Sequence, residues 1–324
     1  MSNALNINGI NISPGDQEIV SIDVGRIPSG SKIFVKAHIY RSKNPGPVML
    51  VLAGVHGDEI NGIEIVRRAI EKGLFENLLK GTVIAIPILN IYGFINFSRE
   101  VPDGKDVNRS FPGNMRGSLA SRVARTLTKK ILPVVDFGID FHTGGASRYN
   151  FPQVRYSKSD PEAKKMALTF GAPLTLKKPI LKNSLRKVAK DLSIPMIVYE
   201  GGESLRLDGL AIEKGMDGLK RVMHSKGMIN SSPKILNKMI LIEKTSWIRA
   251  SQAGLFTWSQ KSGVRIRKGE PVGVINDPDG LSKIVVLSTR NGYIIGHNNA
   301  PVVNAGDALF HIGYDYREEK ISDE

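Results

Sequence analysis

Short apolar runs alternate with helical segments through the middle of this 324-residue chain. The apolar runs lie at 48–53, 82–88, 134–141 and 194–199. Segments with apolar residues at helical spacing lie at 60–73, 118–131, 160–170 and 205–226. A fully apolar run indicates a strand buried on both faces, and strands separated by helices favour a parallel sheet between two helical layers. We therefore expect an α/β fold with a mixed, mostly parallel sheet and helices on both faces.

The two ends of the chain have a different character. Apolar and polar residues alternate at 18–22 and 32–40, which is typical of strands with one buried face. Towards the carboxyl end, short apolar stretches are separated by turn sequences such as 277–280. We therefore predict two domains: residues 1–238 form the α/β unit, and residues 239–324 form a small all-β module.

The composition limits the metal ligands and the compartment. The chain has no cysteine, so disulfides and thiolate ligands are excluded, and any metal must be held by nitrogen and oxygen. No stretch approaches the roughly 20 apolar residues of a membrane span, and residues 1–17 lack the basic start and apolar core of a secretory signal. We expect a cytoplasmic protein with no membrane partner.

The net charge of +14 raises the question of a nucleic-acid partner. Part of the excess lies between Arg155 and Lys190, and this segment is either a phosphate-binding face or an ordinary solvated surface. No nucleic-acid motif accompanies it, and aromatic residues make up only 6% of the chain. We therefore expect no nucleic-acid partner, while the positive field favours small anionic substrates.

Two histidines follow apolar runs where the predicted strands end. His56 comes shortly after the run 48–53, with Glu59 three residues later, and His142 follows the run 134–141. Loops at the carboxyl ends of parallel strands line the ligand-binding edge of an α/β sheet, so these side chains can meet. Two histidines and one carboxylate are protein ligands of catalytic zinc, which keeps a fourth position for water. We predict one Zn2+ on these three residues; a surface turn is the alternative for the His-x-x-Glu sequence alone.

Further polar residues lie near the same predicted strand ends. Asn108 and Arg109 offer amide and guanidinium donors to a carboxylate, or belong to a surface turn. Glu200 ends an apolar strand before two glycines, where it is either a general base or a rim residue. Asp140 shares a strand face with His142 and either orients it or forms a salt bridge. The remaining histidines have no comparable neighbours, which favours structural or exposed positions: His38, His224, His297 and His311.

Four motifs in this order resemble the succinylglutamate desuccinylase and aspartoacylase family, a branch of the zinc carboxypeptidase superfamily. They lie at 54–59, 106–113, 140–145 and 200–202. The resemblance covers roughly residues 45 to 324, including the terminal β module. It implies a zinc carboxypeptidase-like fold and an enzyme that hydrolyses linear amides.

The resemblance also implies a role for each matching residue. Zinc lies on His56, Glu59 and His142; the substrate carboxylate binds Asn108 and Arg109; Glu200 is the base; and Arg99 polarises the scissile carbonyl. The chain departs from aspartoacylases at Ala308 and Leu309, where those enzymes place a substrate-contacting tyrosine. No counterpart is identified for the arginine that reads the substrate's side-chain carboxylate. The chain is most similar to a broader bacterial deacylase subgroup that includes an ectoine-pathway acetyl-diaminobutyrate deacetylase.

The terminal module also resembles a biotinyl or lipoyl carrier fold. A carrier needs a lysine at the tip of a tight hairpin between small or methionine residues, and Lys283 lacks that context. We therefore expect the module to cover or shape the active site, or to mediate formation of a homo-oligomer.

Together these features predict a zinc-dependent deacylase that acts on a small N-acylated amino acid. One alternative is a zinc carboxypeptidase acting on short peptides. Another is a non-catalytic binding protein whose metal site is vestigial. The acyl group, the amino acid and the oligomeric state stay open.

Overall fold

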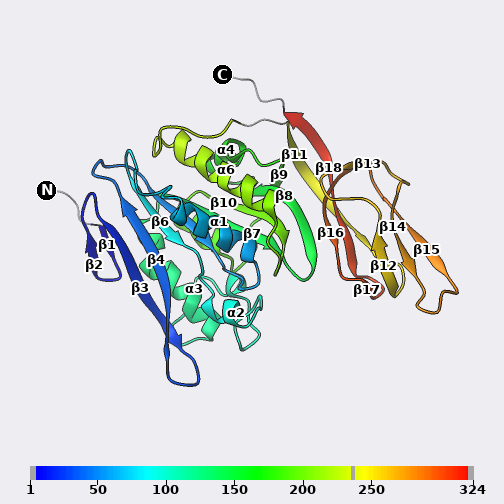
Figure 1. Ribbon diagram of the computed structural model, residues 1–324, viewed down its shortest axis with the longest axis horizontal. Helices are drawn as coiled ribbons and strands as arrows, with labels where there is room; N and C mark the ends of the chain where they lie inside the picture. Colours follow the sequence, from blue (N-terminus) through cyan, green and yellow to red (C-terminus); the bar gives the residue numbers. More distant parts are fainter. Residues whose placement is uncertain (1–4, 235–237, 320–324) are drawn as a thin grey trace.

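A twelve-stranded mixed sheet forms the centre of this computed structural model, which describes residues 5–234 and 238–319. Figure 1 shows the sheet running across the molecule. In spatial order its strands are β13 (Arg265–Ile266), β16 (Gly292–Asn298), β18 (Ala308–Glu319), β11 (Met239–Arg249), β9 (Leu174–Lys177), β8 (Arg148–Tyr156), β10 (Met196–Glu203), β7 (Phe137–Gly144), β5 (Val48–Ala53), β6 (Thr82–Ile86), β4 (Lys32–Arg41) and β3 (Gln17–Arg26).

The sheet is mixed, as the sequence predicts, but parallel pairs do not predominate. Parallel pairing joins β6, β5, β7 and β10, and also joins β8 to β9 and β9 to β11. The other neighbours are antiparallel. The reason is local: β3 and β4 follow each other through a short loop, as do β7 and β8, and short loops reverse the chain direction. The expectation of a mostly parallel sheet is therefore not confirmed: four neighbouring strands, β6, β5, β7 and β10, are parallel, but β10 pairs antiparallel with β8 in the middle of the sheet.

Helices cover both faces of the sheet, as the sequence predicts. One face carries α1 (Ile60–Glu71), α4 (Pro161–Phe170) and α6 (Gly209–Ser225). The other face carries α3 (Leu119–Lys130) and α5 (Leu185–Asp191), with the short α2 (Ile91–Ile95) nearby. Two single 3-10 turns, Val107–Arg109 and Leu132–Val134, lie in the connections.

The alternation of side chains along the strands creates two separate cores. In β5, Met49 and Val51 face the core shared with α1 and α6, whereas Leu50 and Leu52 face the core shared with α3. All four side chains are fully buried. This explains why the strand reads as one unbroken apolar run, because a strand covered on both faces has no solvent side.

Strands from beyond residue 238 extend the central sheet. β11 pairs with β9, and β16 pairs with both β18 and β8. A separate four-stranded sheet, with its own apolar core, contains β15 (Lys283–Leu287), β14 (Pro271–Asn276), β12 (Gly254–Trp258) and β17 (Val302–Val303). β1 (Leu5–Ile7) and β2 (Ile10–Ile12) form a hairpin beside β3. The division into domains 1–238 and 239–324 stays a prediction.

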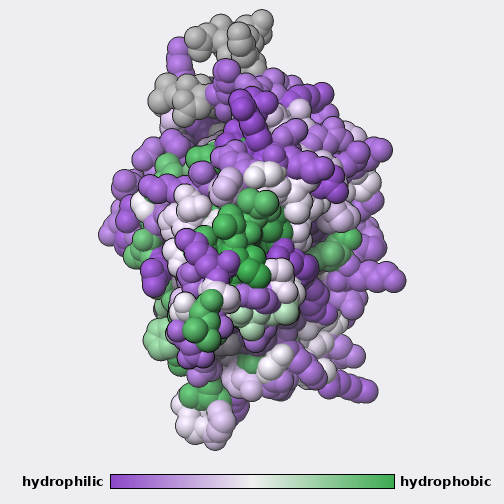
Figure 2. All heavy atoms as spheres, turned by 90° about the vertical axis from the view of Figure 1, so that its right-hand side faces the viewer, coloured by the Kyte–Doolittle hydropathy of each residue, from purple (hydrophilic) through white to green (hydrophobic). Residues whose placement is uncertain are grey.

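The small sheet leaves apolar side chains exposed at its end of the molecule. They include Leu255, Val285, Leu287 and Val302, and Figure 2 shows apolar side chains gathered on this side. Within the described part of the chain, no helix is both long enough and apolar enough to cross a membrane.

Candidate active site

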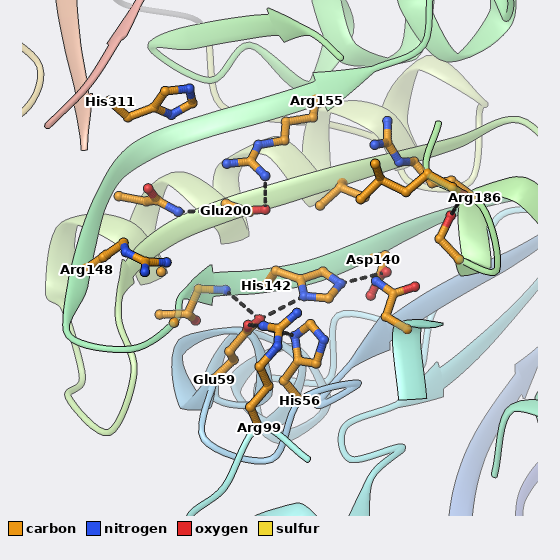
Figure 3. A pocket seen from close by; sticks show the side chains of 18 of the residues that line it. His56, Glu59, Arg99, Asp140, His142, Arg148, Arg155, Arg186, Glu200 and His311 are labelled. Carbon is orange, nitrogen blue, oxygen red and sulfur yellow. Dashed lines mark hydrogen bonds and ion pairs between the residues drawn. The ribbon is translucent and has the colours of Figure 1, made fainter. Parts of the chain in front are cut away.

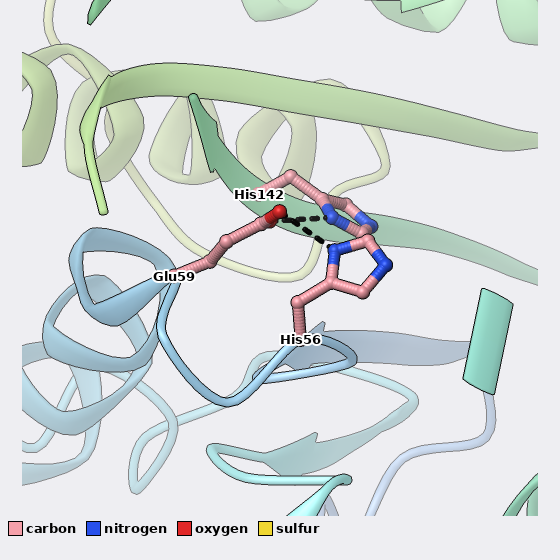
Figure 4. A group of neighbouring side chains, drawn as sticks. All are labelled: His56, Glu59 and His142. Atoms are coloured by element: carbon pink, nitrogen blue, oxygen red, sulfur yellow. Dashed lines mark hydrogen bonds and ion pairs between the residues drawn. The ribbon is translucent and has the colours of Figure 1, made fainter. Parts of the chain in front are cut away.

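His56, Glu59 and His142 converge at the carboxyl ends of two neighbouring parallel strands. His56 lies in the loop after β5, Glu59 precedes the first residue of α1, and His142 lies near the end of β7. The Glu59 carboxylate lies between the two rings: Oε1 is 2.6 Å from His56 Nδ1, and Oε2 is 2.8 Å from His142 Nδ1. Figure 4 shows the three side chains pointing toward one another.

This group fits a metal ion by its chemistry and its packing. One ligand atom from each residue lies within 4.8 Å of the others, and all three side chains are buried. Burial opposes the charged form of Glu59, but His56 and His142 outweigh it and hold the pKa of Glu59 well below its usual range. Two imidazole nitrogens and a carboxylate oxygen are the ligand set of catalytic zinc sites with an open position.

Both histidines are oriented by a second carboxylate. His142 Nε2 lies 2.8 Å from Asp140 Oδ2, and His56 Nε2 lies 3.2 Å from Asp106 Oδ1. Asp140 therefore contacts the His142 ring, as both alternatives for this residue allow. A carboxylate on the far nitrogen fixes the ring and the tautomer, so that Nδ1 could serve as a ligand of a bound metal ion.

Arg99 lies beside the group, on the connection between α2 and the 3-10 turn. Its Nη1 is 3.1 Å from Glu59 Oε1, and its Nη2 donates to Asp106 Oδ2 at 2.9 Å. The carboxylates of Glu59 and Asp106 therefore hold the guanidinium beside the candidate metal site formed by His56, Glu59 and His142. A cation in this position can stabilise negative charge that develops next to the metal.

Asn108 and Arg109 lie on the wall of the same pocket. Asn108 Oδ1 accepts a hydrogen bond from the Leu185 backbone N–H at 2.9 Å, so its side-chain NH2 group remains available. Arg109 Nη1 donates to the Asn108 carbonyl at 2.8 Å and its side chain is exposed. The pair offers three or more donors to one side of the pocket.

Glu200 lies near the end of β10, directly opposite His142 on β7 in the strand register. Its Oε2 accepts from Asn150 Nδ2 at 2.6 Å, and its Oε1 forms an ion pair with Arg155. Both partners come from β8, the antiparallel neighbour of β10. These contacts fix the carboxylate at the pocket wall.

One pocket of about 250 Å³ is lined by the metal-ligand candidates and their polar neighbours (Figure 3): His56, Glu59, Arg99, Asn108, Arg109, Asp140, His142 and Glu200. The pocket also contains residues that sequence reasoning does not identify: Arg148, Asn150, Arg155, Arg186, Trp247 and His311. Arg155 and Arg186 belong to the basic segment between 155 and 190, so part of that segment lines the pocket. His311, for which the sequence favours a structural or exposed position, is buried, and strand pairing in the terminal module brings it to the pocket wall.

The pocket wall is strongly cationic. Burial, together with Arg155 nearby, lowers the pKa of Arg186 to about 10 and that of Lys178, just behind the wall, to about 8. Arg186 Nη1 is buried and has no hydrogen-bond partner among the described residues. Burial also holds the pKa of His311 well below its usual range, so this ring is neutral. Such a pocket favours an anionic ligand.

Comparisons of the sequence and of the structure with known proteins find deacylases of one family. The family model for the succinylglutamate desuccinylase/aspartoacylase catalytic domain matches residues 45–225. N-alpha-acetyl-L-2,4-diaminobutyric acid deacetylase of Halomonas elongata is 25% identical over 283 residues, which cover 82% of each chain.

Solved structures show the same architecture over nearly the whole length. A succinylglutamate desuccinylase/aspartoacylase from Rhodobacter sphaeroides superposes with a TM-score of 0.82 at 25% identity, covering 93% of this chain and 96% of that one. The product-bound ectoine utilization protein EutE (DoeB) from Ruegeria pomeroyi also gives a TM-score of 0.82, at 20% identity, covering 92% and 94%. The second likeness concerns the fold alone.

Proposed function

Because this chain belongs to the succinylglutamate desuccinylase/aspartoacylase family, we propose that it is a zinc-dependent deacylase of a small N-acyl amino acid. The reaction adds water across the amide bond and releases a carboxylate and a free amine. The observation that carries the proposal is the convergence of His56, Glu59 and His142 within 4.8 Å in a pocket that also holds Glu200.

His56, Glu59 and His142 would hold the zinc ion. When bound, zinc supplies Lewis-acid activation of water and of a carbonyl oxygen. Asp140 and Asp106 support this assignment, because each orients one histidine through the ring nitrogen that faces away from Glu59.

Glu200 is the proposed general base. It removes a proton from the attacking water and then passes that proton to the leaving amine. Its contacts with Asn150 and Arg155 support this role, because they hold the carboxylate in a fixed position at the pocket wall. Arg99 is the proposed donor to the carbonyl oxygen as negative charge develops there.

Asn108 and Arg109 are the proposed binding site of the substrate's α-carboxylate. Arg186 supports an anionic ligand at this end, because its neighbour Leu185 donates to Asn108 Oδ1 and its buried Nη1 has no partner among the described residues. A guanidinium can bind a carboxylate through two parallel hydrogen bonds.

The proposal is tested by substrate screening. The purified, zinc-loaded protein is assayed against N-acetyl, N-succinyl and N-formyl amino acids and against short peptides, with released amine as the readout. We expect hydrolysis of acylamino acids, and slower hydrolysis, by roughly a hundredfold or more, with a Glu200→Gln preparation purified in the same way. Cleavage of peptides alone would identify a carboxypeptidase, and no cleavage at all would favour a binding protein.

A further inference from the structure

A second cavity, of about 700 Å³, is distinct from the active-site pocket, and no described residue lines both. Its wall comes from the segments that follow β8 and β9, from α5 and from β11. It belongs largely to the basic segment between Arg155 and Lys190, for which the sequence leaves open a phosphate-binding face or a solvated surface. Five of its lining residues are lysines: Lys158, Lys177, Lys178, Lys187 and Lys190.

Two of the five lysines are paired with carboxylates. Lys177 forms an ion pair with Glu243, and Lys187 forms one with Asp191. These two carboxylates are the acidic residues in the cavity wall. The wall therefore keeps an excess of positive charge, carried by the lysines that form no ion pair with any residue that the structure describes: Lys158, Lys178 and Lys190.

Lys190 is held by hydroxyl groups and not by a carboxylate. Its Nζ donates to Ser159 Oγ at 2.6 Å, and the hydroxyl oxygens of Ser159 and Ser157 lie 3.0 Å apart. An ammonium group has three N–H donors, so Lys190 keeps donors for a ligand, and the two hydroxyls can donate or accept. Ammonium and hydroxyl donors side by side suit the oxygens of a phosphate group.

Lys178 carries a positive charge that is partly buried. Its Nζ donates to Thr245 Oγ1 at 2.6 Å and to the neutral His311 ring at 3.3 Å, so neither contact supplies an opposite charge. Burial, together with Arg155 nearby, lowers the pKa of this lysine to about 8. An anion in the cavity would offset the burial, because a nearby opposite charge favours the protonated form.

The loop between β9 and α5 lies between the two cavities. Lys178 and Pro179 line the second cavity, whereas Leu181 lines the active-site pocket. The Pro179 carbonyl accepts from Arg186 Nη2 at 3.1 Å, and Arg186 lines the active-site pocket (Figure 3). Lys178 reaches the same pocket through its hydrogen bond to His311. The cations of this wall therefore lie close to both cavities.

We propose that the second cavity is a regulatory site for a small anion that carries a phosphate group. Lys158, Lys178 and Lys190 bind the phosphate, and the Ser157 and Ser159 hydroxyls add further contacts. None of the lining residues is aromatic, so a compact phosphate or a sugar phosphate suits the cavity better than a stacked nucleobase.

The bound anion weakens binding of an anionic substrate. Both anions draw on the cations of one wall, and their own charges repel each other across it. By linkage, the substrate weakens phosphate binding by the same factor. This regulatory effect rests on the proposed function, whereas phosphate binding to the cavity does not.

Calorimetry of the zinc-loaded protein with inorganic phosphate tests the binding. The double variant Lys158→Gln/Lys190→Gln removes two exposed lysines that lie outside the active-site pocket. We expect it to weaken phosphate binding at the second cavity by about tenfold or more, the scale of a lost charged hydrogen bond. Lys190→Arg should retain binding, because the charge remains.

Two comparisons make the binding result specific. Lys268→Gln/Lys283→Gln removes the same charge from exposed positions outside the cavity and should bind phosphate as the parent does. Phosphate bound at the active site is common to all of these proteins, so only the difference between them reports on the second cavity. A six-carbon sugar bisphosphate is titrated in parallel: tighter binding than phosphate identifies a phosphorylated metabolite as the ligand, and equal binding identifies free phosphate.

Kinetics with an N-acyl amino acid tests the regulation. Phosphate should raise KM with a component of about fivefold that saturates, because coupling between two sites is finite, whereas competition at the active site has no upper limit. Lys158→Gln/Lys190→Gln should lose the saturating component and keep the parent kcat and KM in the absence of phosphate. Sodium chloride at equal ionic strength controls for screening.

The outcomes separate the site, its regulatory role and the proposed function. Equal phosphate binding by the parent and by Lys158→Gln/Lys190→Gln would overturn the site. Weaker binding by the variant, with no saturating rise of KM in the parent, would overturn the regulatory role. The proposed function is tested separately, by hydrolysis with the parent protein in the absence of phosphate.

Discussion

Strand register places Glu200 beside His142, one of the three candidate metal ligands. Glu200 lies opposite His142 in the pairing of β10 with β7, so both side chains belong to one row of the sheet. Asn150 and Arg155 then hold its two carboxylate oxygens from the other side. The position is therefore fixed by backbone pairing first and by side-chain contacts second.

Replacing Glu200 by Gln keeps the size of the side chain and removes the proton acceptor. We expect kcat to fall by roughly a hundredfold or more, the scale of general-base catalysis, while zinc remains bound. Steady-state kinetics and elemental analysis check the two parts. Glu213→Gln, an exposed change on α6, is the control. Activity of Glu200→Gln within a few-fold of the parent would show that Glu200 is a rim residue.

Arg109 tests how the α-carboxylate is recognised. Replacing the free carboxylate of the substrate by an amide should lower kcat/KM by at least about tenfold, because the arginine then loses its charged partner. Arg109→Lys should reduce that difference, since an ammonium cannot form the two-pronged contact. The kinetics of free and amidated N-acyl amino acids are compared with both proteins. Equal rates on the two substrates would mean that Asn108 and Arg109 do not bind the α-carboxylate.

At the scale of elements, the loop that carries His56 depends on a close approach to α2. A Cβ atom at Gly57 would lie 1.9 Å from the Gly93 carbonyl carbon and 2.0 Å from the Phe94 nitrogen. Both neighbours are backbone atoms, which cannot move aside without moving the helix. The loop and α2 therefore keep their positions together.

Gly57→Ala should consequently displace the loop. We expect a loss of about 1–3 kcal/mol in the free energy of unfolding, typical of overpacking, together with weaker zinc binding. Gly209→Ala is the matched control, because a Cβ atom there meets no atom within 4 Å. Denaturant unfolding and zinc titration measure both quantities. Parent-like zinc affinity in Gly57→Ala would contradict this account of the loop.

β16 contains a buried histidine with a lowered pKa, His297. His297 Nδ1 lies 2.7 Å from Ser262 Oγ, and the ring contacts Tyr149 and Trp258. Burial lowers the pKa of His297 to about 4, against 6.5 for an unperturbed histidine. Between these values the unfolded chain binds a proton that the folded chain does not, so stability falls as the pH falls.

We therefore expect the free energy of unfolding to decrease as the pH is lowered from about 6.5 toward 4. His297→Phe should show a shallower dependence in this window, because the phenyl ring does not titrate. Urea denaturation at a series of pH values checks the slope. Parallel curves for the parent and the variant would show that His297 does not contribute.

At the scale of the whole molecule, the pocket is completed by residues far apart in the sequence. The sequence predicts the central strands and helices because β5 and β7 are unbroken apolar runs, and it identifies His56, Glu59 and His142 because each adjoins such a strand. Their meeting follows from parallel neighbours ending at one edge.

Other residues of the pocket are not marked by any pattern in the neighbouring sequence. Arg148 and Asn150 lie on β8, which the sequence analysis does not identify as a strand. Trp247 and His311 reach the pocket only through pairing of β11 and β18 with the central sheet, a contact between segments that are distant along the chain. The antiparallel pairs are missed for a similar reason, because apolar patterns indicate burial and not strand direction.

The most direct test of the central claim is the zinc content of the purified protein. If His56, Glu59 and His142 are the protein ligands, elemental analysis should find about one zinc per chain. His142→Ala should lose most of the metal while its circular dichroism spectrum stays that of the parent, and His224→Ala should stay loaded. A fully loaded His142→Ala protein would contradict the account.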